Sequence, residues 1–249
     1  MNLTSPSQVK AWCIANDFHP NRTLGQNFLV DRNALVAIVD AGLGAGAAQG
    51  VRVLEVGPGL GVLTEEMLRR GAMVTAVEKD PVLAARLAES LGNPPGLTVV
   101  EGDALDVAAG RGEFAMQPGG FDFMVSNLPY QSGTRILLEL VTRRAVPSMT
   151  VLVQAEVAAR LAAGPGSKTR SLAGVWAQLD YDVRVVRKVS PSCFRLCSNA
   201  RLVKRRKKAR ISAERPAFLS CRTRVTTAEP TSGRGQKQLG DTLRTTLMS

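Results

Sequence analysis

Apolar and polar positions follow one another along residues 51–189 in an order that predicts strands and helices in turn. Short apolar runs with few charges predict buried strands, and the stretches between them have the spacing of apolar positions that is typical of amphipathic helices. The predicted strands are residues 51–56, 73–77, 97–100, 121–126, 148–153 and 181–189. Strands that alternate with helices in this way indicate an α/β fold with a doubly wound parallel sheet.

The same pattern divides the chain into three parts. Residues 1–50 form an N-terminal helical segment, with helices predicted at 5–15 and 31–42. Residues 51–194 form the core, which is built around the sheet. Residues 195–249 have no sustained period of two or 3.6 residues and few large apolar side chains, so we interpret them as a disordered tail.

The position of the charge changes what it indicates about partners. The 249 residues carry a net charge of +11, which by itself favours a nucleic-acid partner. Residues 1–194 contain 18 Lys and Arg against 18 Asp and Glu, whereas residues 195–249 contain 14 Lys and Arg against three acids. The whole excess lies in the tail, so polyanion binding inferred from charge is a property of the tail and not of the core. The core can be sizeable, because 45% of residues are hydrophobic.

Cysteine and histidine usage argues against a metal site. No Cys-x-x-Cys pair occurs, and the single histidine is distant in sequence from most of the cysteines, so we expect reduced thiols. These residues are Cys13, His19, Cys193, Cys197 and Cys221. The N-terminus has no apolar run of the signal-peptide kind, and no stretch approaches the roughly 20 apolar residues of a membrane span. We therefore expect a cytoplasmic protein without a membrane partner or a metal.

A glycine-rich turn follows the first predicted strand of the core. Gly57, Gly59 and Gly61 lie between that strand and a predicted helix, where glycine permits positive φ angles and the close approach of a ligand. Glu78 ends the second strand, 21 residues after Gly57, where a carboxylate can accept hydrogen bonds from both hydroxyls of a ribose. Val62 occupies the place of the third glycine in the nicotinamide dinucleotide fingerprint, which argues against such a cofactor.

Two further acids each have two interpretations. Glu55 lies in an otherwise apolar strand and needs a partner, which is either a cationic cofactor or the backbone amides of the glycine loop. Asp103 follows the third strand, where it either accepts a hydrogen bond from an adenine amino group or caps a turn or helix. Its position in series with Gly57 and Glu78 favours the binding role.

The tetrapeptide Asn127-Leu128-Pro129-Tyr130 follows the fourth predicted strand and is the most specific signal in the chain. The amino group of adenine is a poor nucleophile because its lone pair is delocalised. The Asn127 side-chain oxygen and the Leu128 carbonyl can accept both amine protons and push the nitrogen toward tetrahedral geometry. Pro129 stiffens the turn, and the Tyr130 ring can stack on an extruded base, a contact worth roughly 1–3 kcal/mol. A sulfonium methyl donor then requires alignment with the nitrogen and no general base. The alternative is a structural turn beside a core tyrosine.

Together these elements resemble the rRNA adenine N6,N6-dimethyltransferase family, and most of all its bacterial small-subunit members. The matching segments are residues 24–29, 55–61, 78, 102–104, 127–130 and 189–194. The resemblance implies a Rossmann-like methyltransferase fold with S-adenosylmethionine as cofactor. It implies a cofactor site lined by Asn27, Leu29, Gly57, Glu78, Asp103 and Asn127. It also implies a catalytic site made by Asn127, Leu128, Pro129 and Tyr130, with Phe194 on the other side of the target adenine from Tyr130.

The resemblance implies a substrate as well. Members of the family transfer two methyl groups to each of two adjacent adenines near the 3′ end of small-subunit (16S) rRNA, late in ribosome assembly. The expected partner is therefore small-subunit rRNA in an assembly intermediate, and the expected oligomeric state is a monomer. Arg160 and Lys168 either touch RNA phosphate or are ordinary solvated side chains.

After Phe194 the sequence departs from the family pattern. The family continues with a proline-rich turn, a last apolar strand and a small helical domain that helps to dock on rRNA, whereas residue 195 here begins the basic tail. Because charge balance, periodicity and resemblance end together, we interpret residues 195–249 as the product of a reading-frame change, with a basic RNA-binding tail as the alternative. We expect the last strand and the helical C-terminal domain to be missing, and residues 181–189 to be a poorly paired edge.

Two functions follow from this reading. The first is an rRNA adenine dimethyltransferase whose activity is impaired by the aberrant C-terminus. The second is a non-catalytic rRNA-binding assembly factor that keeps the cofactor fold. The intact tetrapeptide favours the enzyme, because a protein that only binds RNA has no need of it.

Overall fold

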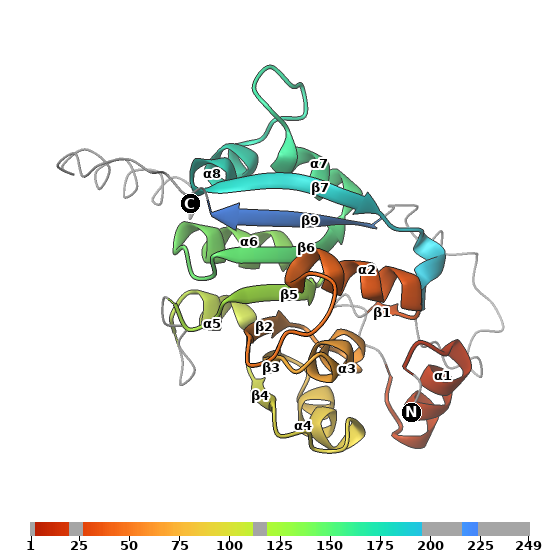
Figure 1. Ribbon diagram of the computed structural model, residues 1–249. Helices are drawn as coiled ribbons and strands as arrows, with labels where there is room; N and C mark the ends of the chain where they lie inside the picture. The colour runs from red at the N-terminus through yellow and green to blue at the C-terminus, as the bar shows by residue number, and fades with distance from the viewer. Residues whose placement is uncertain (1–2, 20–26, 112–118, 196–215, 224–249) are drawn as a thin grey trace.

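The computed structural model describes residues 3–19, 27–111, 119–195 and 216–223, and within these ranges seven strands form one central sheet (Figure 1). The strands are β2 (Arg52–Val56), β3 (Met73–Glu78), β4 (Leu97–Glu101), β5 (Phe123–Asn127), β6 (Ser148–Gln154), β7 (Tyr181–Lys188) and β9 (Pro216–Thr223). Their order is β4-β3-β2-β5-β6-β9-β7, and all neighbours are parallel except the two pairs that contain β9. The predicted α/β fold with a mainly parallel sheet is confirmed.

Helices cover both faces of the sheet. They are α2 (Arg32–Leu43), α3 (Val62–Arg69), α4 (Pro81–Ser90), α5 (Ala104–Ala108), α6 (Gly133–Thr142), α7 (Ala155–Ala162) and α8 (Leu172–Asp180). A further helix, α1 (Pro6–Ala15), packs in a separate apolar cluster with Phe28, Leu60 and Leu83. One apolar cluster joins α2, α3 and α4 to the sheet, and another joins α5, α6, α7 and α8 to it. Figure 1 shows α2 in front of β5 and β6, α6 behind β6, and α7 behind β7. The sheet is therefore doubly wound, as the alternation of strands and helices predicts.

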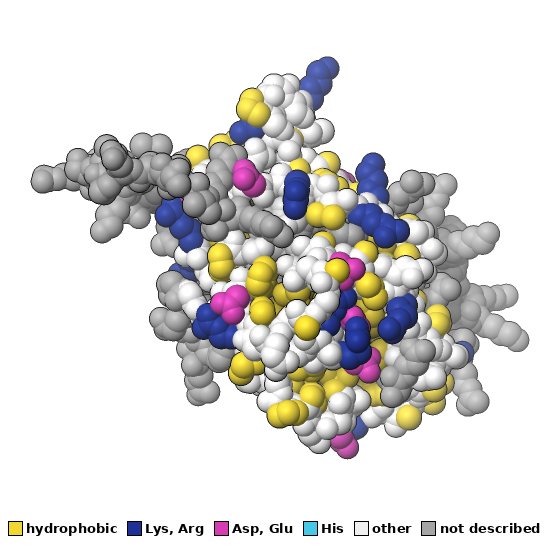
Figure 2. Space-filling view, in the orientation of Figure 1, with side chains coloured by type: hydrophobic (Ala, Val, Ile, Leu, Met, Phe, Trp, Pro, Cys, Tyr) yellow, Lys and Arg dark blue, Asp and Glu magenta, His cyan; other side chains and the backbone are white. Residues whose placement is uncertain are grey.

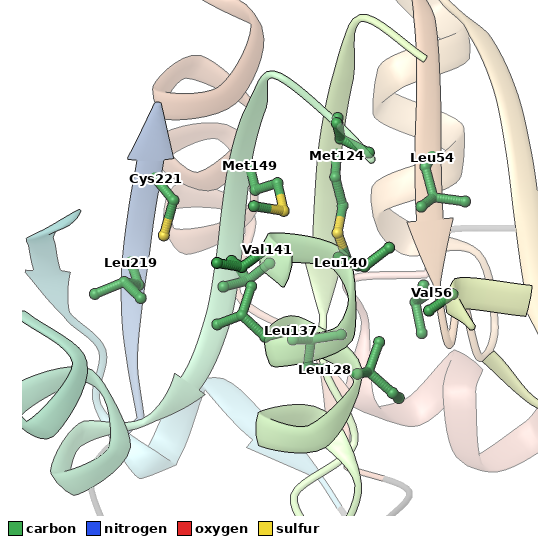
Figure 3. Close-up of a cluster of buried hydrophobic side chains, with 14 of the residues drawn as sticks. Leu54, Val56, Met124, Leu128, Leu137, Leu140, Val141, Met149, Leu219 and Cys221 are labelled. Carbon is green, nitrogen blue, oxygen red and sulfur yellow. The ribbon is translucent and has the colours of Figure 1, made fainter. Parts of the chain in front are cut away.

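The apolar cluster beneath α6 holds the middle of the sheet in place. Leu137, Leu140 and Val141 of α6 point toward Met124 of β5 and Met149 of β6 (Figure 3). Each of these side chains is at most 1% exposed. Burying a side chain of this size contributes roughly 1.5–3 kcal/mol. The cluster thus fixes the path of β5, whose last residue opens the tetrapeptide that the sequence singles out.

Strand β9 corrects the expectation that the last strand of the sheet is missing. Residues 216–223 lie between β6 and β7 and pair with both, from Gln154↔Pro216 to Ser148↔Arg222 on one side. Ala217, Leu219 and Cys221 face the apolar cluster and are at most 1% exposed. The sequence interpretation missed them because this period of two lasts only five residues within a strongly basic segment, well beyond the point where the family strand is expected.

Strand β7 is accordingly not the poorly paired edge that we expected. It is the outermost strand of the described sheet, but β9 pairs with it from Tyr181↔Thr223 to Lys188↔Ala217, with one bulge between Val185 and Arg187. The prediction of a disordered tail falls on residues 196–215 and 224–249, which lie outside the described residues.

Replacing Leu219 with Ala tests the place of β9 in the core. Leu219 is 0% exposed, so the variant is expected to lower the free energy of unfolding by at least about 2 kcal/mol. Val185→Ala on β7 is the control, because Val185 is 40% exposed and its truncation should cost less than about 0.5 kcal/mol. Urea denaturation measures both, and equal effects of the two variants would show that β9 is not seated between β6 and β7.

A second, short sheet lies at the carboxyl edge of the main one. It pairs β1 (Phe28–Leu29) with β8 (Phe194–Arg195) in the antiparallel sense, and the 3-10 helix η2 (Pro191–Cys193) precedes β8. This pairing brings the N-terminal segment to the edge of the sheet where ligands bind in doubly wound folds. Among the described helices, none has the length and apolar character needed to cross a membrane.

Candidate active site

A cavity of about 210 Å³ opens at the carboxyl ends of β2, β3 and β5. Its wall includes nine of the ten residues that the sequence assigns to the site: Asn27, Leu29, Gly57, Glu78, Asp103, Asn127, Leu128, Pro129 and Tyr130. These residues come from five separate segments, and they meet because parallel strands present their carboxyl ends at one edge of the sheet. The tenth residue, Phe194, is not part of this wall.

The glycine turn after β2 forms the floor of the cavity. Gly57, Gly59 and Gly61 have φ angles of +67°, +59° and +87°, which residues with a side chain rarely adopt. A Cβ atom on Gly59 would lie 3.2 Å from the ring of Phe28, and a Cβ on Gly61 would lie 2.6 Å from Leu87. The turn therefore needs glycine both for its backbone conformation and for the space around it.

Glu78 holds the glycine turn from the end of β3. Its Oε2 accepts a hydrogen bond from the Gly59 amide at 3.1 Å, and its Oε1 accepts one from the Asp80 amide at 2.9 Å. The side chain is buried, and this burial raises its pKa, although the two backbone hydrogen bonds oppose the rise. The carboxylate is thus fixed in the cavity wall with lone pairs left for a ligand.

Asp103 combines the two roles that the sequence leaves open. It caps α5, since its Oδ1 accepts a hydrogen bond from the Leu105 amide at 2.9 Å, and it also lines the cavity. Its Oδ2 forms an ion pair with the Lys79 ammonium at 2.7 Å. Burial acts to raise the pKa of Asp103, but the hydrogen bonds from Lys79 and Leu105 outweigh it and hold the pKa below its ordinary value.

Glu55 has a partner that neither sequence interpretation named. Its side chain is 1% exposed in the cavity wall, and its Oε2 accepts a hydrogen bond from the Thr64 hydroxyl of α3 at 2.6 Å. The pKa of Glu55 is raised to about 8, mainly by burial; the Thr64 hydrogen bond opposes this rise and the nearby Glu78 carboxylate adds to it. The Glu55 carboxyl group is therefore mostly protonated at neutral pH when the cavity holds no cation.

The tetrapeptide forms a tight turn between β5 and α6. The Leu128 amide donates to the Leu152 carbonyl at 3.1 Å, and the Pro129 carbonyl accepts from the Gly133 amide at 2.7 Å. A Cβ on Gly133 would lie 2.9 Å from the Leu128 Cβ, so this glycine allows the turn to close. Gly133 is a site residue that the sequence did not single out, and its signal is its position three residues after Tyr130.

Asn127 lines the cavity and has a buried acceptor atom. Its Nδ2 donates to the Asn27 carbonyl at 3.2 Å, and its Oδ1 is buried without a hydrogen-bond partner among the described residues. A buried acceptor without a partner costs about 1–3 kcal/mol, so such an atom in a cavity wall indicates a ligand donor group. Tyr130 lies beside it, and its hydroxyl accepts a hydrogen bond from the Asn27 Nδ2 at 3.3 Å.

Phe194 does not join Tyr130 at the cavity. Its side chain is 6% exposed and packs in the apolar cluster of the α2 face, together with Leu29 and Val189. Pairing of β8 with β1 sets Phe194 opposite Leu29 and turns the ring into this cluster. In this arrangement Phe194 lies outside the cavity wall, and its place opposite Tyr130 on a target base stays a prediction.

Basic side chains stand exposed near the same edge of the sheet. β7 runs parallel to β6, so its last residues lie at the carboxyl edge, and Arg184, Arg187 and Lys188 are all exposed. Figure 2 shows Lys and Arg side chains on the upper part of the molecule, where β7 lies. Arg160 and Lys168 are also exposed. Within the described ranges, no group of three His, Cys, Asp or Glu side chains is arranged to hold a metal ion.

The glycine turn, the carboxylate that ends the second strand and the Asn-Leu-Pro-Tyr turn at one cavity define a Rossmann-like fold of the methyltransferase class. The chain belongs to the ribosomal RNA adenine dimethylase family, because the sequence profile described as "Ribosomal RNA adenine dimethylase" matches residues 17–205.

Individual relatives agree with this assignment. The chain is 45% identical over 192 residues to Ribosomal RNA small subunit methyltransferase A of Deinococcus radiodurans, covering 77% of this chain and 62% of that protein. It is 44% identical over 200 residues to the protein of the same name from Mycobacterium tuberculosis (strain ATCC 25177 / H37Ra), covering 78% and 61%. The chain thus spans about three fifths of the length of these relatives.

Solved structures show the same fold. The crystal structure of the 23S rRNA methyltransferase ErmE matches with a TM-score of 0.63 at 26% identity, covering 87% of this chain and 77% of that one. A dimethyladenosine transferase from Plasmodium falciparum matches with a TM-score of 0.60 at 21% identity, covering 78% and 62%. The second likeness concerns the fold alone.

Proposed function

We propose that this protein transfers methyl groups from S-adenosylmethionine to the N6 amino groups of two adjacent adenines near the 3′ end of small-subunit (16S) rRNA, during ribosome biogenesis. The observation that carries the proposal is the buried Oδ1 of Asn127, which has no partner among the described residues and borders the cavity. The relatives named Ribosomal RNA small subunit methyltransferase A support the choice of rRNA.

The residues of the cavity fit the cofactor. Gly57 and Gly59 allow a ligand to approach the backbone closely, and Glu78 has acceptor capacity left for ribose hydroxyls. Asp103 would accept from the adenine amino group of the cofactor, and Asn27 and Leu29 would close the cavity from the N-terminal segment. When bound, S-adenosylmethionine supplies an electrophilic methyl group on a sulfonium.

The residues of the turn then prepare the target base. Tyr130 stacks on the extruded adenine, the Asn127 Oδ1 accepts one N6 proton, and the Leu128 carbonyl accepts the other. These two acceptors would favour a tetrahedral nitrogen with its lone pair directed at the methyl group that bound S-adenosylmethionine would supply. A proton of the methylated nitrogen would then pass to water. Alignment supplies most of the rate, since the sulfonium is already a strong electrophile.

The partner in this proposal is an assembly intermediate of the small ribosomal subunit, bound by a monomer. Exposed Arg187 and Lys188 at the end of β7, with Arg184 in its middle, support contact with RNA phosphate. Arg160 and Lys168 are further candidates for such contacts.

Methyl transfer from labelled S-adenosylmethionine to undermethylated small subunits tests the proposal. The expected product is N6,N6-dimethyladenine in 16S rRNA, identified by mass spectrometry of nucleosides, with no label in large subunits treated in parallel. Label only in 23S rRNA would contradict the proposed substrate and indicate a 23S rRNA methyltransferase, as ErmE is named. Binding of the cofactor and of small subunits without any transfer would instead support a non-catalytic assembly factor.

A further inference from the structure

Asn27 contacts both polar residues of the tetrapeptide at once. Its main-chain carbonyl accepts a hydrogen bond from Asn127 Nδ2 at 3.2 Å, and its side-chain Nδ2 donates to the Tyr130 hydroxyl at 3.3 Å. These residues lie 100 and 103 positions apart in the sequence. One residue of the N-terminal segment therefore joins the two groups that the proposed function assigns to the target base.

The backbone of Asn27 is held in place from its carboxyl side. Phe28 and Leu29 form β1, which pairs with β8, and their side chains are 7% and 2% exposed. The Val30 amide donates to the Cys193 carbonyl at 2.8 Å, and Asp31 caps α2 by accepting from the Ala34 amide at 2.7 Å. With four successive residues fixed, the Asn27 carbonyl has a defined position.

This position decides which end of the Asn127 amide faces the cavity. With Nδ2 directed at the Asn27 carbonyl, Oδ1 is left as an acceptor without a partner among the described residues, on a side chain that lines the cavity. The flipped amide would set two acceptor oxygens against each other and would turn a donor toward the substrate amine. The Asn27 carbonyl therefore selects the orientation that methyl transfer to an amine requires.

The side chain of Asn27 acts in the same way on Tyr130. A tyrosine ring can swing about χ1, and a hydrogen bond to its hydroxyl, at the far end of the ring, restrains that swing. A stacking surface in a defined orientation leaves less freedom for the base to lose on binding.

We infer that Asn27 is a positioning residue for the methylated base: its carbonyl orients the Asn127 acceptor and its side chain orients the Tyr130 ring. This inference rests on the proposed function, and it goes beyond the cofactor contact expected of Asn27. Substitution of Asn27 tests only the contact of its side chain with Tyr130, because any residue at position 27 keeps the main-chain carbonyl that contacts Asn127.

A double-mutant cycle tests the route through Tyr130. At saturating S-adenosylmethionine, which separates this role from any cofactor contact of Asn27, Asn27→Ala and Tyr130→Phe are each expected to lower kcat for small subunits about 10-fold. The kcat of the double variant should be lowered by no more than about 10-fold, because both changes remove the hydrogen bond between Asn27 Nδ2 and the Tyr130 hydroxyl. Losses in kcat that multiply to about 100-fold, or an unchanged kcat for Asn27→Ala, would overturn the inference. Asn33→Ala, at an exposed position of α2, is the control for the substitution itself.

A measurement without catalysis separates this inference from the proposed function. The chain has two tyrosines, and Tyr181 is buried with its hydroxyl bonded to the Val146 carbonyl at 2.9 Å. In protein labelled with 3-fluorotyrosine, Asn27→Ala should shift the ¹⁹F resonance of Tyr130 and leave that of Tyr181 unchanged. If Asn27→Ala shifts the Tyr130 resonance but the unchanged protein transfers no methyl group, the positioning role is supported and the proposed function is contradicted. An unshifted resonance would reject the positioning role, whatever the activity.

Discussion

Replacing Asn127 with Ala is expected to lower methyl transfer to small-subunit rRNA by about 10²–10³-fold, the usual effect of removing one preorganised hydrogen-bonding group from a reaction centre. The variant loses the buried Oδ1 that has no partner among the described residues and that the proposed mechanism assigns to the target amine. Among the described residues, Asn127 makes no side-chain hydrogen bond to the glycine turn or to Glu78. The cofactor should therefore still bind within a few-fold of its original affinity. Single-turnover transfer and calorimetric titration of the cofactor measure the two quantities.

Asn127→Asp is the informative companion of this variant. It keeps an acceptor oxygen in the cavity but cannot donate to the Asn27 carbonyl, so the carboxylate loses its fixed orientation. We expect a rate between those of the Asn and Ala forms. A rate for Asn127→Ala within a few-fold of the unchanged protein would contradict the role of Oδ1 as the amine acceptor. It would leave Asn127 as a structural residue of the turn.

The parts of the site that follow strand ends could be predicted from the sequence, because strand order and direction place them without knowledge of side-chain packing. Gly57, Glu78, Asp103 and Asn127 each follow or end a strand with a clear apolar pattern, and the cavity brings all four together. The hydrogen bond between Asn27 and Tyr130 could not be predicted, because residues 103 positions apart meet only through the pairing of β1 with β8. The partner of Glu55 was missed for a similar reason, since Thr64 reaches it from α3 across the glycine turn.

Two segments have partners in the fold that the sequence does not reveal. Phe194 carries a family motif, but the direction of its ring depends on the register of β8 against Leu29. In β9, Leu219 and Cys221 are core residues inside a segment with a large positive charge, and composition averaged over the tail conceals them. A strand is defined by its neighbours as much as by its own residues, and here the neighbours β6 and β7 are apolar on the buried face.

The stability of the ligand-free protein is expected to fall as the pH rises from about 5 to about 8, and Glu55 is the main cause. Its pKa is about 8 in the folded protein and 4.5 in the unfolded chain, so in this window the folded state holds a proton that the unfolded state has lost. The contribution of Glu55 is complete below the unfolded value and is lost as the pH rises through the folded value. The free energy of unfolding should fall by up to about 1.4 kcal/mol per pH unit.

Glu55→Gln should remove most of this pH dependence, because glutamine keeps a hydrogen-bonding group for the Thr64 hydroxyl and carries no titrating proton. In this variant Glu78 should still make the free energy of unfolding fall with rising pH, since its pKa is also raised. Glu66 does not contribute in this window, because its pKa is lowered to about 2 and its titration affects stability only at lower pH. Glu65→Gln, at an exposed position on the same helix as Thr64, is the control and should keep the original slope. Urea denaturation at pH 5, 6, 7 and 8 compares the three proteins. If the free energy of unfolding changes equally with pH in all three proteins, Glu55 is ionised in the folded protein. A cation that stabilises its carboxylate would then have to be identified.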